Sequence, residues 1–556
     1  MKFPAWVSGW LRRGGTTAAM TAVVLAADGA PVLNVPVADT SMNSTSAPWL
    51  PDLGDGRYRN PILQADYSDP DVVRVGDDYW MTASSFSHVP GLPLLHSRDL
   101  VNWELVGHAL PRLVPEDFFR VPQPGKGVWA PAIRFHAGRY WIYYPDPDFG
   151  LYVIAAEDPR GPWSAPVLVK AGKGLIDPCP LWDTDGRVYL IHAWAKSRAG
   201  INNVLTLLRL SADGQRVEED LGVVIDGHRF PGTTTLEGPK FYQRNGWYYV
   251  FAPAGGVATG WQVVYRSRDI RGPYTDRIVL AQGDTPVNGP HQGALVDTPQ
   301  GEWWFLHFQD QAAYGRVVHL QPVAWRDDWP NVGTGAASGV VTGAPVLVHA
   351  KPTLPVQPRT APGTSDPFLG PMLAPQWQWQ ANPSADWYSL TERPRHLRLR
   401  PPTGVAPRLY EAPNLLLQKF PAREFDVTVT VELAPAAEGD RAGLIVFGYD
   451  YAWLGLRRQG DRTVLVYGSV HEAQKGHAEQ IEELGPTIAG PVQLRASVRE
   501  GGKVTWSWRT GSQPFQPVGR EFTATVGHWV GAKVGLFVTG STAAHADFAA
   551  FEVTAP

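Results

Sequence analysis

The chain has 556 residues and a formal net charge of -4 at pH 7, and hydrophobic residues make up 44% of it. This length exceeds what one ordinary core holds, so we expect two folded domains joined by linkers. The composition shows no basic patch for nucleic acid, and the single cysteine, Cys179, excludes an internal disulfide and a cysteine-based zinc site.

The N-terminal residues have the pattern of an export signal. Basic residues at positions 2, 12 and 13 precede a mildly apolar run over 17–27, which is too short to span a membrane. We therefore predict an export signal over residues 1–27 and a periplasmic or extracellular protein, the alternative being a disordered cytoplasmic leader. Residues 28–57 are rich in Pro, Ser, Thr and Asp without periodicity, which indicates a linker.

A five-fold repeat begins near Tyr58. A glycine followed within three residues by an aromatic side chain recurs at intervals of 62, 48, 60 and 55 residues. The five glycines are Gly76, Gly138, Gly186, Gly246 and Gly301. Glycine permits a tight hairpin, and the intervals suit one four-stranded blade each. The repeat predicts a five-bladed β-propeller over residues 58–328.

A second domain follows a Gly/Pro-rich crossing over residues 329–365. Apolar and polar residues alternate over 425–433, 504–508 and 534–538, as they do in half-buried strands. We expect an antiparallel β-sandwich over residues 366–556, which makes the predicted fold class all-β.

Five side chains are predicted to meet on the propeller axis. The innermost strand of each blade lines the central channel, so residues at a similar distance before each hairpin glycine converge there. Counting back seven to ten positions gives Asp69, Trp129, Asp177, Glu237 and His291. Crowding buried carboxylates costs free energy, so three acids in one pocket indicate a function.

Three carboxylates suit the hydrolysis of a glycosidic bond. One carboxylic acid protonates the leaving oxygen, and one carboxylate activates water or attacks carbon. A third carboxylate near the proton donor raises the donor's pKa and keeps it protonated. The alternative for each acid by itself is a turn cap, because each stands beside or close to a proline.

Several motifs resemble those of glycoside hydrolase family 43. They are Asn60-Pro-Ile-Leu, Ser68-Asp-Pro-Asp, Trp129-Ala-Pro, Leu175-Ile-Asp-Pro, Leu236-Glu-Gly-Pro and Gly289-Pro-His-Gln-Gly. Residues 377–388 and 545–552 resemble the concanavalin-like sandwich of the β-xylosidase and α-L-arabinofuranosidase type. The resemblance implies that Asp69 is the general base, Asp177 the residue that tunes the acid's pKa, and Glu237 the general acid. Pro180 departs from the pattern at the wall of the sugar subsite.

The resemblance also implies substrate-binding residues. Phe86 matches a residue that walls the terminal-sugar subsite, Trp129 belongs to a matching motif, and Arg316 matches a substrate-facing arginine. His291 matches a histidine that points into the channel, sometimes beside calcium. Alternatives are a hydrogen-bonded core position for His291 and a loop salt bridge for Arg316. No cofactor is expected to be required, and a structural calcium near His291 is the one metal considered.

The expected activity is exo-acting and inverting release of terminal β-D-xylose, α-L-arabinofuranose or both from hemicellulose oligosaccharides. The partners would be fragments of xylan, arabinan or xyloglucan, with no nucleic acid and no membrane span. An inverting pair of carboxyl groups stands about 6.5–9.5 Å apart. Alternatives are an endo-arabinanase-like hydrolase, a non-catalytic carbohydrate-binding propeller and a retaining fructosidase, whose usual Asn-Asp-Pro and Glu-Cys motifs the sequence lacks.

Overall fold

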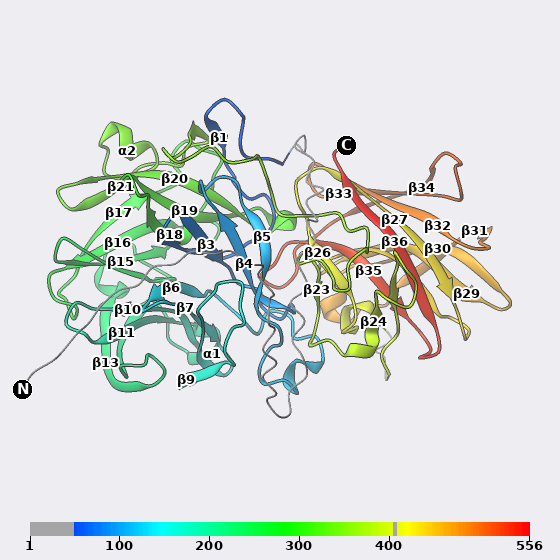
Figure 1. The fold of residues 1–556 in the computed structure, drawn as a ribbon, viewed down its shortest axis with the longest axis horizontal. Helices are drawn as coiled ribbons and strands as arrows, with labels where there is room; N and C mark the ends of the chain where they lie inside the picture. Colours follow the sequence, from blue (N-terminus) through cyan, green and yellow to red (C-terminus); the bar gives the residue numbers. More distant parts are fainter. Residues whose placement is uncertain (1–48, 404–407) are drawn as a thin grey trace, which may run out of the picture. The chain divides into compact units, whose positions relative to one another are not determined.

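The computed structural model describes residues 49–403 and 408–556 (Figure 1). The predicted export signal and most of the predicted linker lie outside these residues. Within the described ranges, no helix has both the length and the apolar character needed to cross a membrane. Helices are few and short: α1 (Lys196–Ala199), α2 (Thr334–Ser338), η1 (Phe118–Arg120), η2 (Gly227–Arg229), η3 (Ala312–Tyr314), η4 (Ala385–Trp387), η5 (Leu409–Glu411) and η6 (Ala473–Lys475).

The first domain is the predicted five-bladed propeller, and each blade is a four-stranded antiparallel sheet. Blade 1 contains β2 (Asp71–Val75), β3 (Asp78–Thr82), β4 (Gly91–Ser97) and β5 (Glu104–Leu110). Blade 2 contains β6 (Ala132–His136), β7 (Arg139–Asp146), β8 (Gly150–Ala156) and β9 (Val167–Ala171). Blade 3 contains β10 (Leu175–Trp182), β11 (Val188–Trp194), β12 (Val204–Leu210) and β13 (Val217–Asp226).

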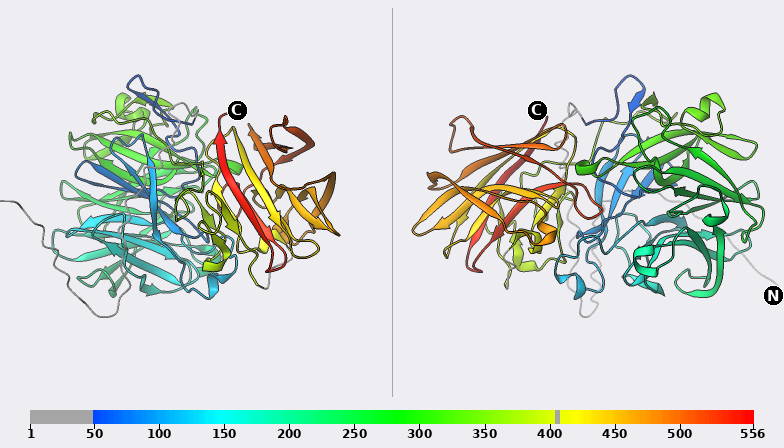
Figure 2. Two further views of the ribbon diagram at one scale, coloured as in Figure 1. Left: turned by 45° about the vertical axis from the view of Figure 1, so that its right-hand side comes forward. Right: turned by 180° about the vertical axis from the view of Figure 1, so that it is seen from behind.

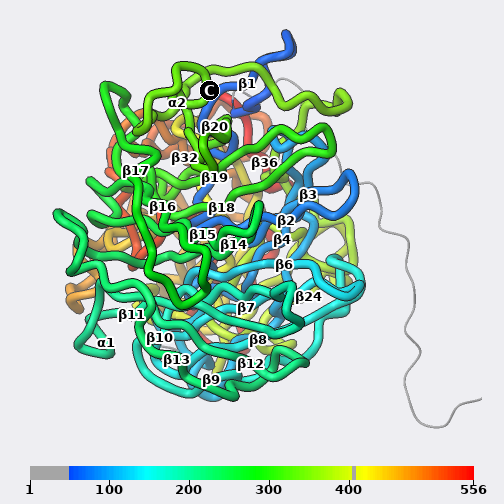
Figure 3. The backbone as a smooth tube through the Cα atoms, turned by 90° about the vertical axis from the view of Figure 1, so that its left-hand side faces the viewer, coloured from blue at the N-terminus to red at the C-terminus, as the bar shows by residue number. Residues whose placement is uncertain are grey.

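Blade 4 contains β14 (Lys240–Arg244), β15 (Trp247–Ala254), β16 (Trp261–Ser267) and β17 (Thr275–Leu280). Blade 5 contains β18 (His291–Asp297), β19 (Trp303–Asp310), β20 (Arg316–Arg326) and β21 (Trp329–Val332). In Figure 3 the first strands β2, β6, β14 and β18 lie toward the middle of the ring, and β9, β13 and β17 lie toward its rim. The channel is therefore lined by the strands that the repeat predicted.

The repeated glycines stand in the turn between the first and second strand of every blade. Their φ angles lie between +62° and +85°, a conformation that side chains with a Cβ rarely adopt. Five apolar clusters fill the spaces between neighbouring blades. One of them packs Tyr79 and Met81 of the first blade against Ala294 and Leu306 of the last, so the ring closes through side-chain packing.

The boundary of the propeller differs from the prediction. β21 completes blade 5 with residues that the Gly/Pro-rich crossing over 329–365 was expected to contain. The same segment continues through α2 to β22 (Val348–Ala350), which pairs with β1 (Arg57–Arg59) at the start of the described chain. The sequence did not predict this strand, because Pro330 and Asn331 are typical of turns and unusual in strand interiors.

The second domain is a sandwich of two seven-stranded antiparallel sheets, shown from further sides in Figure 2. One sheet has the order β23 (Gln378–Trp379), β26 (Leu416–Lys419), β35 (Lys533–Thr539), β28 (Arg441–Phe447), β29 (Tyr451–Gln459), β30 (Arg462–Val470) and β31 (Gln480–Thr487). The other has the order β24 (Tyr388–Ser389), β25 (Leu397–Leu399), β36 (His545–Thr554), β27 (Phe425–Ala434), β32 (Val492–Arg499), β33 (Lys503–Arg509) and β34 (Gln516–Thr523).

Strict alternation of burial along β27 shows how this sandwich forms. Val427, Val429 and Val431 are fully buried between the sheets, and the residues between them are partly exposed. Backbone hydrogen bonds also join the sandwich to the propeller: the N–H of Val89 donates to the carbonyl of Trp379 at 3.0 Å, and the N–H of Trp379 donates to the carbonyl of Val89. This ladder holds the segment after Phe86 in place.

Candidate active site

The three predicted acids come from separate blades. Asp69 lies two residues before β2, Asp177 lies within β10, and Glu237 lies three residues before β14. Asp69 and Asp177 have φ angles of +55° and +56°, which is costly for residues other than glycine. At Asp177 the pairing of β10 with β11 is also interrupted by a bulge between Ile176 and Cys179. Such local strain is concentrated at functional positions.

Asp69 is buried and its carboxylate is held by three donors. The hydroxyls of Ser68 and Ser84 donate to Oδ2 at 2.6 and 2.5 Å. The guanidinium of Arg316 lies 3.5 Å from Oδ1 and also donates to the hydroxyl of Ser68 at 2.7 Å. These contacts fix the direction of the carboxylate. Sequence reasoning missed Ser84. Its position two residues after the second strand of the same blade could have indicated it.

Asp177 is the most enclosed of the three acids. Its Oδ2 accepts the N–H of Gly238 at 2.7 Å, and Gly238 is the residue that follows Glu237. A Cβ at Gly238 would come within 2.6 Å of the Gln292 side chain, so this close approach requires glycine. Burial raises the pKa of Asp177 well above its usual value, and the charges of Glu237 and Asp69 raise it further. The three carboxyl groups therefore interact electrostatically.

Glu237 is more open to solvent than its neighbours. Its side chain is 25% exposed, whereas that of Asp69 is 8% exposed. Oε1 lies 3.3 Å from Nε2 of His291, the first residue of β18. The other ring nitrogen of His291 is buried and has no hydrogen-bond partner among the described residues. Glu237 is thus the acid that a bound substrate reaches most easily.

Arg316, the first residue of β20, lies in the pocket beside Asp69. Its guanidinium stacks on Phe308 at 4.9 Å and lies 5.9 Å from the ring of Trp529. A longer contact of 3.8 Å links its Nε to Asp310, so the loop salt bridge considered from the sequence is present as well. The aromatic faces and Ser68 hold the guanidinium in one direction.

Aromatic rings from both domains contact one another near Arg316. Phe86 and Trp129 meet edge to face at 6.3 Å, and Trp129 meets Trp529 at 6.0 Å. Phe86 has a φ of +50° and exchanges two backbone hydrogen bonds with Val128. Trp529 stands in the sandwich loop between β34 and β35, and sequence reasoning missed it because a single aromatic in a loop carries no periodic signal.

A buried ionic contact supports the strands below the acids. The carboxylate of Asp71 accepts the N–H of Ile133 at 2.7 Å and Nη1 of Arg134 at 2.6 Å. Nη2 of Arg134 lies 2.9 Å from the sulfur of Cys179, which also accepts the N–H of Phe241 at 3.2 Å. Blades 1, 2, 3 and 4 are joined here. Asp71 belongs to the Ser68-Asp-Pro-Asp motif, which was the available signal.

The predicted acids, His291 and Arg316 interact with one another, and Phe86 and Trp129 are joined to them through Trp529, but these residues do not assemble a metal site. Among the described residues, no group of three or more His, Cys, Asp or Glu side chains is placed to hold a metal ion. Calcium prefers six to eight oxygen ligands, and within the described part of the chain the only acidic side chain in contact with His291 is Glu237. These residues do not fit a calcium cage built from protein side chains, so no chemical step is assigned to a metal.

A five-bladed propeller with three interacting carboxyl groups at its channel, followed by a concanavalin-like sandwich, defines a glycosidase of the propeller class. Residues 58–330 match the family described as Glycosyl hydrolases family 43. Residues 365–554 match the Beta xylosidase C-terminal Concanavalin A-like domain. The chain therefore belongs to glycoside hydrolase family 43.

Similar proteins support this assignment. The chain is 37% identical over 504 residues to a putative beta-xylosidase of Xylanibacter ruminicola, covering 88% of this chain and 87% of the relative. It is 29% identical to a non-reducing end alpha-L-arabinofuranosidase of Bacteroides ovatus, covering 90% and 94%. A crystal structure of a family 43 protein from Bacillus licheniformis superposes with a TM-score of 0.77 at 26% identity, covering 90% of this chain and all of that one.

Proposed function

We propose that this glycosidase is exo-acting and inverting, and that it releases terminal β-D-xylose, α-L-arabinofuranose or both from hemicellulose oligosaccharides. One observation carries the proposal. Asp177 accepts a hydrogen bond from the backbone N–H of Gly238, the residue after Glu237, and it interacts electrostatically with both Glu237 and Asp69. Glycoside hydrolysis needs only two carboxyl groups, an acid and a base. A third carboxyl group that interacts with both can shift their pKa values apart, so that one acts as the acid and the other as the base.

Asp69 acts as the general base. It removes a proton from a water molecule whose oxygen attacks the anomeric carbon, while the bond from that carbon to the leaving oxygen breaks. Glu237 gives its proton to the leaving oxygen, and the sugar is released with inverted configuration and no covalent intermediate. The fixed direction of the Asp69 carboxylate favours one position for the attacking water.

Asp177 acts as a positioning and tuning residue. Asp177 and Glu237 repel each other when both are ionised, so the pair retains one proton over a wider pH range than two separate carboxyl groups would. The N–H of Gly238 stabilises negative charge on Asp177. Glu237, the more exposed member of the pair, is the one that a leaving oxygen reaches.

The pocket walls support a single terminal sugar as the ligand. Phe86, Trp129 and Trp529 offer apolar ring surfaces against which the C–H face of a pentose packs. His291 and Arg316 offer donors for sugar hydroxyls beside the acids. Similar proteins are named for xylosidase or arabinofuranosidase activity, which supports fragments of xylan, arabinan or xyloglucan as substrates.

The proposal is tested by following the products. Proton NMR during hydrolysis of xylobiose and of an arabino-oligosaccharide should show the inverted anomer first, and chromatography should show free pentose from the first minutes. Retention of configuration would contradict the mechanism. Oligosaccharide products without free pentose would instead support the endo-arabinanase-like alternative, and binding without turnover would support a carbohydrate-binding propeller.

We also propose that no cofactor takes part and that the protein is exported to the periplasm or beyond. General acid–base chemistry by carboxyl groups needs no metal, so kcat should survive dialysis against EDTA. A loss of kcat that calcium restores would contradict this expectation. Export rests on the pattern of residues 1–27, and N-terminal sequencing of the mature protein from cell fractions tests it.

A further inference from the structure

Two lysines, one of them buried and the other half-buried, stand directly opposite each other in one sheet of the sandwich. Lys419 ends β26, Lys533 begins β35, and the two residues are partners in the antiparallel register. Directly opposed side chains project from the same face with Cβ atoms about 4.5–5.5 Å apart. Lys533 is only 2% exposed. Like charges in this arrangement repel each other, and burial removes the water that would screen them.

Neither ammonium group has a hydrogen-bond or ion-pair partner in the described part of the chain, and Lys419 has only the face of an aromatic ring. No hydrogen bond or ion pair with a described residue is formed by Nζ of Lys419 or of Lys533, and the nearest ring contact is that of Lys419 with Tyr67 at 5.1 Å. Other lysines away from solvent are satisfied: buried Lys240 donates to the carbonyl of Pro131 at 2.7 Å, and half-buried Lys351 lies 2.6 Å from Asp52. A buried charge without a partner is costly, so this pair needs an explanation.

The surrounding groups leave an excess of positive charge. Asp66 is the acid whose charge acts on both lysines, but its two oxygens accept the N–H groups of Arg316 and Gly531 at 2.9 and 3.0 Å. Burial lowers the pKa of the neighbouring His108 to about 3 and that of His88 well below its usual value, so both rings are neutral at pH 7. One carboxylate therefore faces the ammonium group of Lys419 and the amine of Lys533, which is only partly protonated at pH 7 because burial and the charge of Lys419 lower its pKa to about 7.

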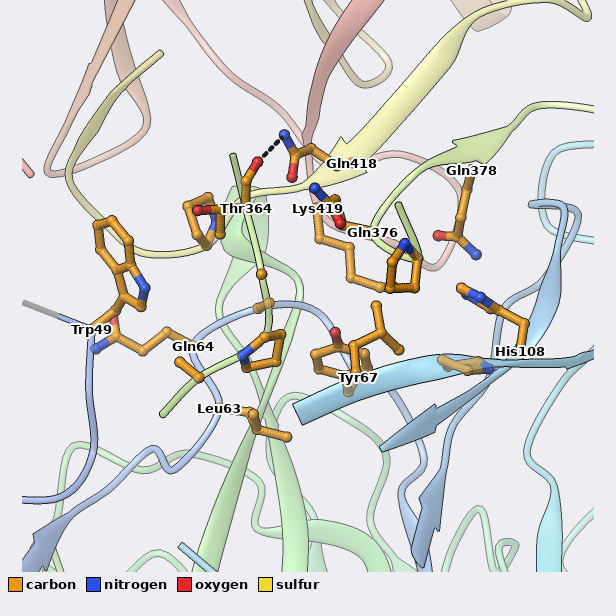
Figure 4. A pocket seen from close by; sticks show the side chains of 18 of the residues that line it. Trp49, Leu63, Gln64, Tyr67, His108, Thr364, Gln376, Gln378, Gln418 and Lys419 are labelled. Carbon is orange, nitrogen blue, oxygen red and sulfur yellow. Dashed lines mark hydrogen bonds between the residues drawn. The ribbon is translucent and has the colours of Figure 1, made fainter. Parts of the chain in front are cut away.

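A small cavity adjoins these residues. Its volume is about 40 Å³, and its lining includes Tyr67, His108, Gln378 and Lys419 (Figure 4). The hydroxyl of Tyr67 also has no hydrogen-bond partner among the described residues, although Tyr67 is only 2% exposed. A water molecule needs about 10–15 Å³ measured in this way, so the cavity holds a few waters or one small ion and excludes a sugar.

We propose that this cavity binds one inorganic anion of halide size, contacted by Lys419 and the hydroxyl of Tyr67 and attracted by Lys533. The anion neutralises the excess charge and accepts the hydrogen bonds that both side chains lack. Because residues from the propeller and the sandwich line the cavity, the anion stabilises the packing of one domain on the other. A ligand that binds the folded state alone raises the melting temperature with its concentration.

Crystals soaked in sodium bromide test the position of the anion. Diffraction at the bromine absorption edge should show an anomalous peak in the cavity beside Lys419, and the Lys419→Met variant should lack it. Density for water without an anomalous peak would overturn the proposal. A peak in crystals without any effect in solution would show binding at crystal concentration only, and would also overturn it.

Melting curves test the anion in solution. Sodium chloride is compared with sodium gluconate at equal ionic strength, because gluconate is too large for the cavity. The wild type should melt at a higher temperature in chloride than in gluconate, and this difference should level off as the chloride concentration rises. Lys419→Met should show no such difference, even if the substitution changes its melting temperature in both salts. The matched control is Lys503→Met, which removes an exposed lysine of the same domain. Equal melting of the wild type in both salts, or an increment retained by Lys419→Met, would contradict the site.

Discussion

The ring of Trp529, in the sandwich, lies 6.0 Å from the ring of Trp129, in the propeller, with an angle of 69° between them. The loop that carries Trp529 is held at Gly531, whose N–H donates to Asp66, and the other oxygen of Asp66 accepts the N–H of Arg316. The appended domain thus places an aromatic ring beside Trp129 and Arg316, close to acids that all belong to the propeller.

Replacing Trp529 by alanine should raise KM for xylobiose several-fold and leave kcat nearly unchanged. The ring contributes binding surface that the substrate and the transition state use alike, and it is not connected to the acids by a hydrogen bond. Steady-state kinetics with xylobiose and xylotetraose measure the effect. Phe135→Ala, an exposed aromatic of blade 2, serves as the control and should leave both constants unchanged. A kcat that falls with unchanged KM would contradict a purely binding role.

Substrates with different leaving groups should distinguish the general acid from the general base when each of the two proposed catalytic acids is replaced. General acid or base catalysis contributes about 10²–10⁴-fold, so Asp69→Ala and Glu237→Ala should each reduce kcat on xylobiose by that order. A nitrophenolate leaves without protonation, so Glu237→Ala should lose much less on 4-nitrophenyl pentosides. Asp69→Ala should lose equally on both substrates. The opposite pattern would exchange the two assignments.

Asp177→Asn should lower activity and move the alkaline limb of the kcat/KM profile to lower pH. The Asp177–Glu237 pair as a whole retains a proton because its two charges repel each other, and the substitution removes that repulsion. The pH profile on xylobiose measures the shift. A profile of unchanged shape with a uniformly lower rate would indicate that Asp177 only positions the chain at Gly238.

The same variant should be more stable than the wild type at neutral pH. The folded protein raises the pKa of Asp177 above its unfolded value, so ionised Asp177 destabilises the fold, and this cost grows as pH rises above the unfolded value. Asparagine carries no charge and avoids it. Melting temperatures at pH 4 and pH 7 should show a larger gain at pH 7. No gain at pH 7 would mean that the lost hydrogen bond from Gly238 outweighs the relieved charge.

The propeller could be predicted because its signals are local. Each repeated glycine lies in a hairpin of a few residues and has a positive φ there. The turn can therefore be predicted from the residues next to the glycine. The position of Asp177 or Glu237 relative to that turn then follows from the length of one strand. The end of blade 5 was harder, because β21 contains Pro330 and Asn331 and reads as a turn.

Contacts between distant segments could not be predicted in this way. Asp66 and Gly531 are 465 residues apart, and no turn or periodicity relates them. Lys533 stands at the start of an apolar strand, where a lysine ordinarily reaches solvent. It is nevertheless only 2% exposed, and the charge of Asp66, from the propeller, acts on it. Such positions depend on how two domains meet, which spacing along one chain does not encode.

The pH dependence of stability should expose Lys533. Burial and the charge of Lys419 lower its pKa from 10.5 to about 7, so the unfolded chain binds more protons than the folded protein between about pH 7 and 10.5. The contribution of Lys533 to the free energy of unfolding therefore rises with pH across this window. In gluconate, the melting temperature of Lys533→Met should exceed that of the wild type most at pH 7 and least near pH 10. Lys503→Met should follow the wild type, and parallel curves for all three proteins would show that Lys533 keeps its ordinary pKa.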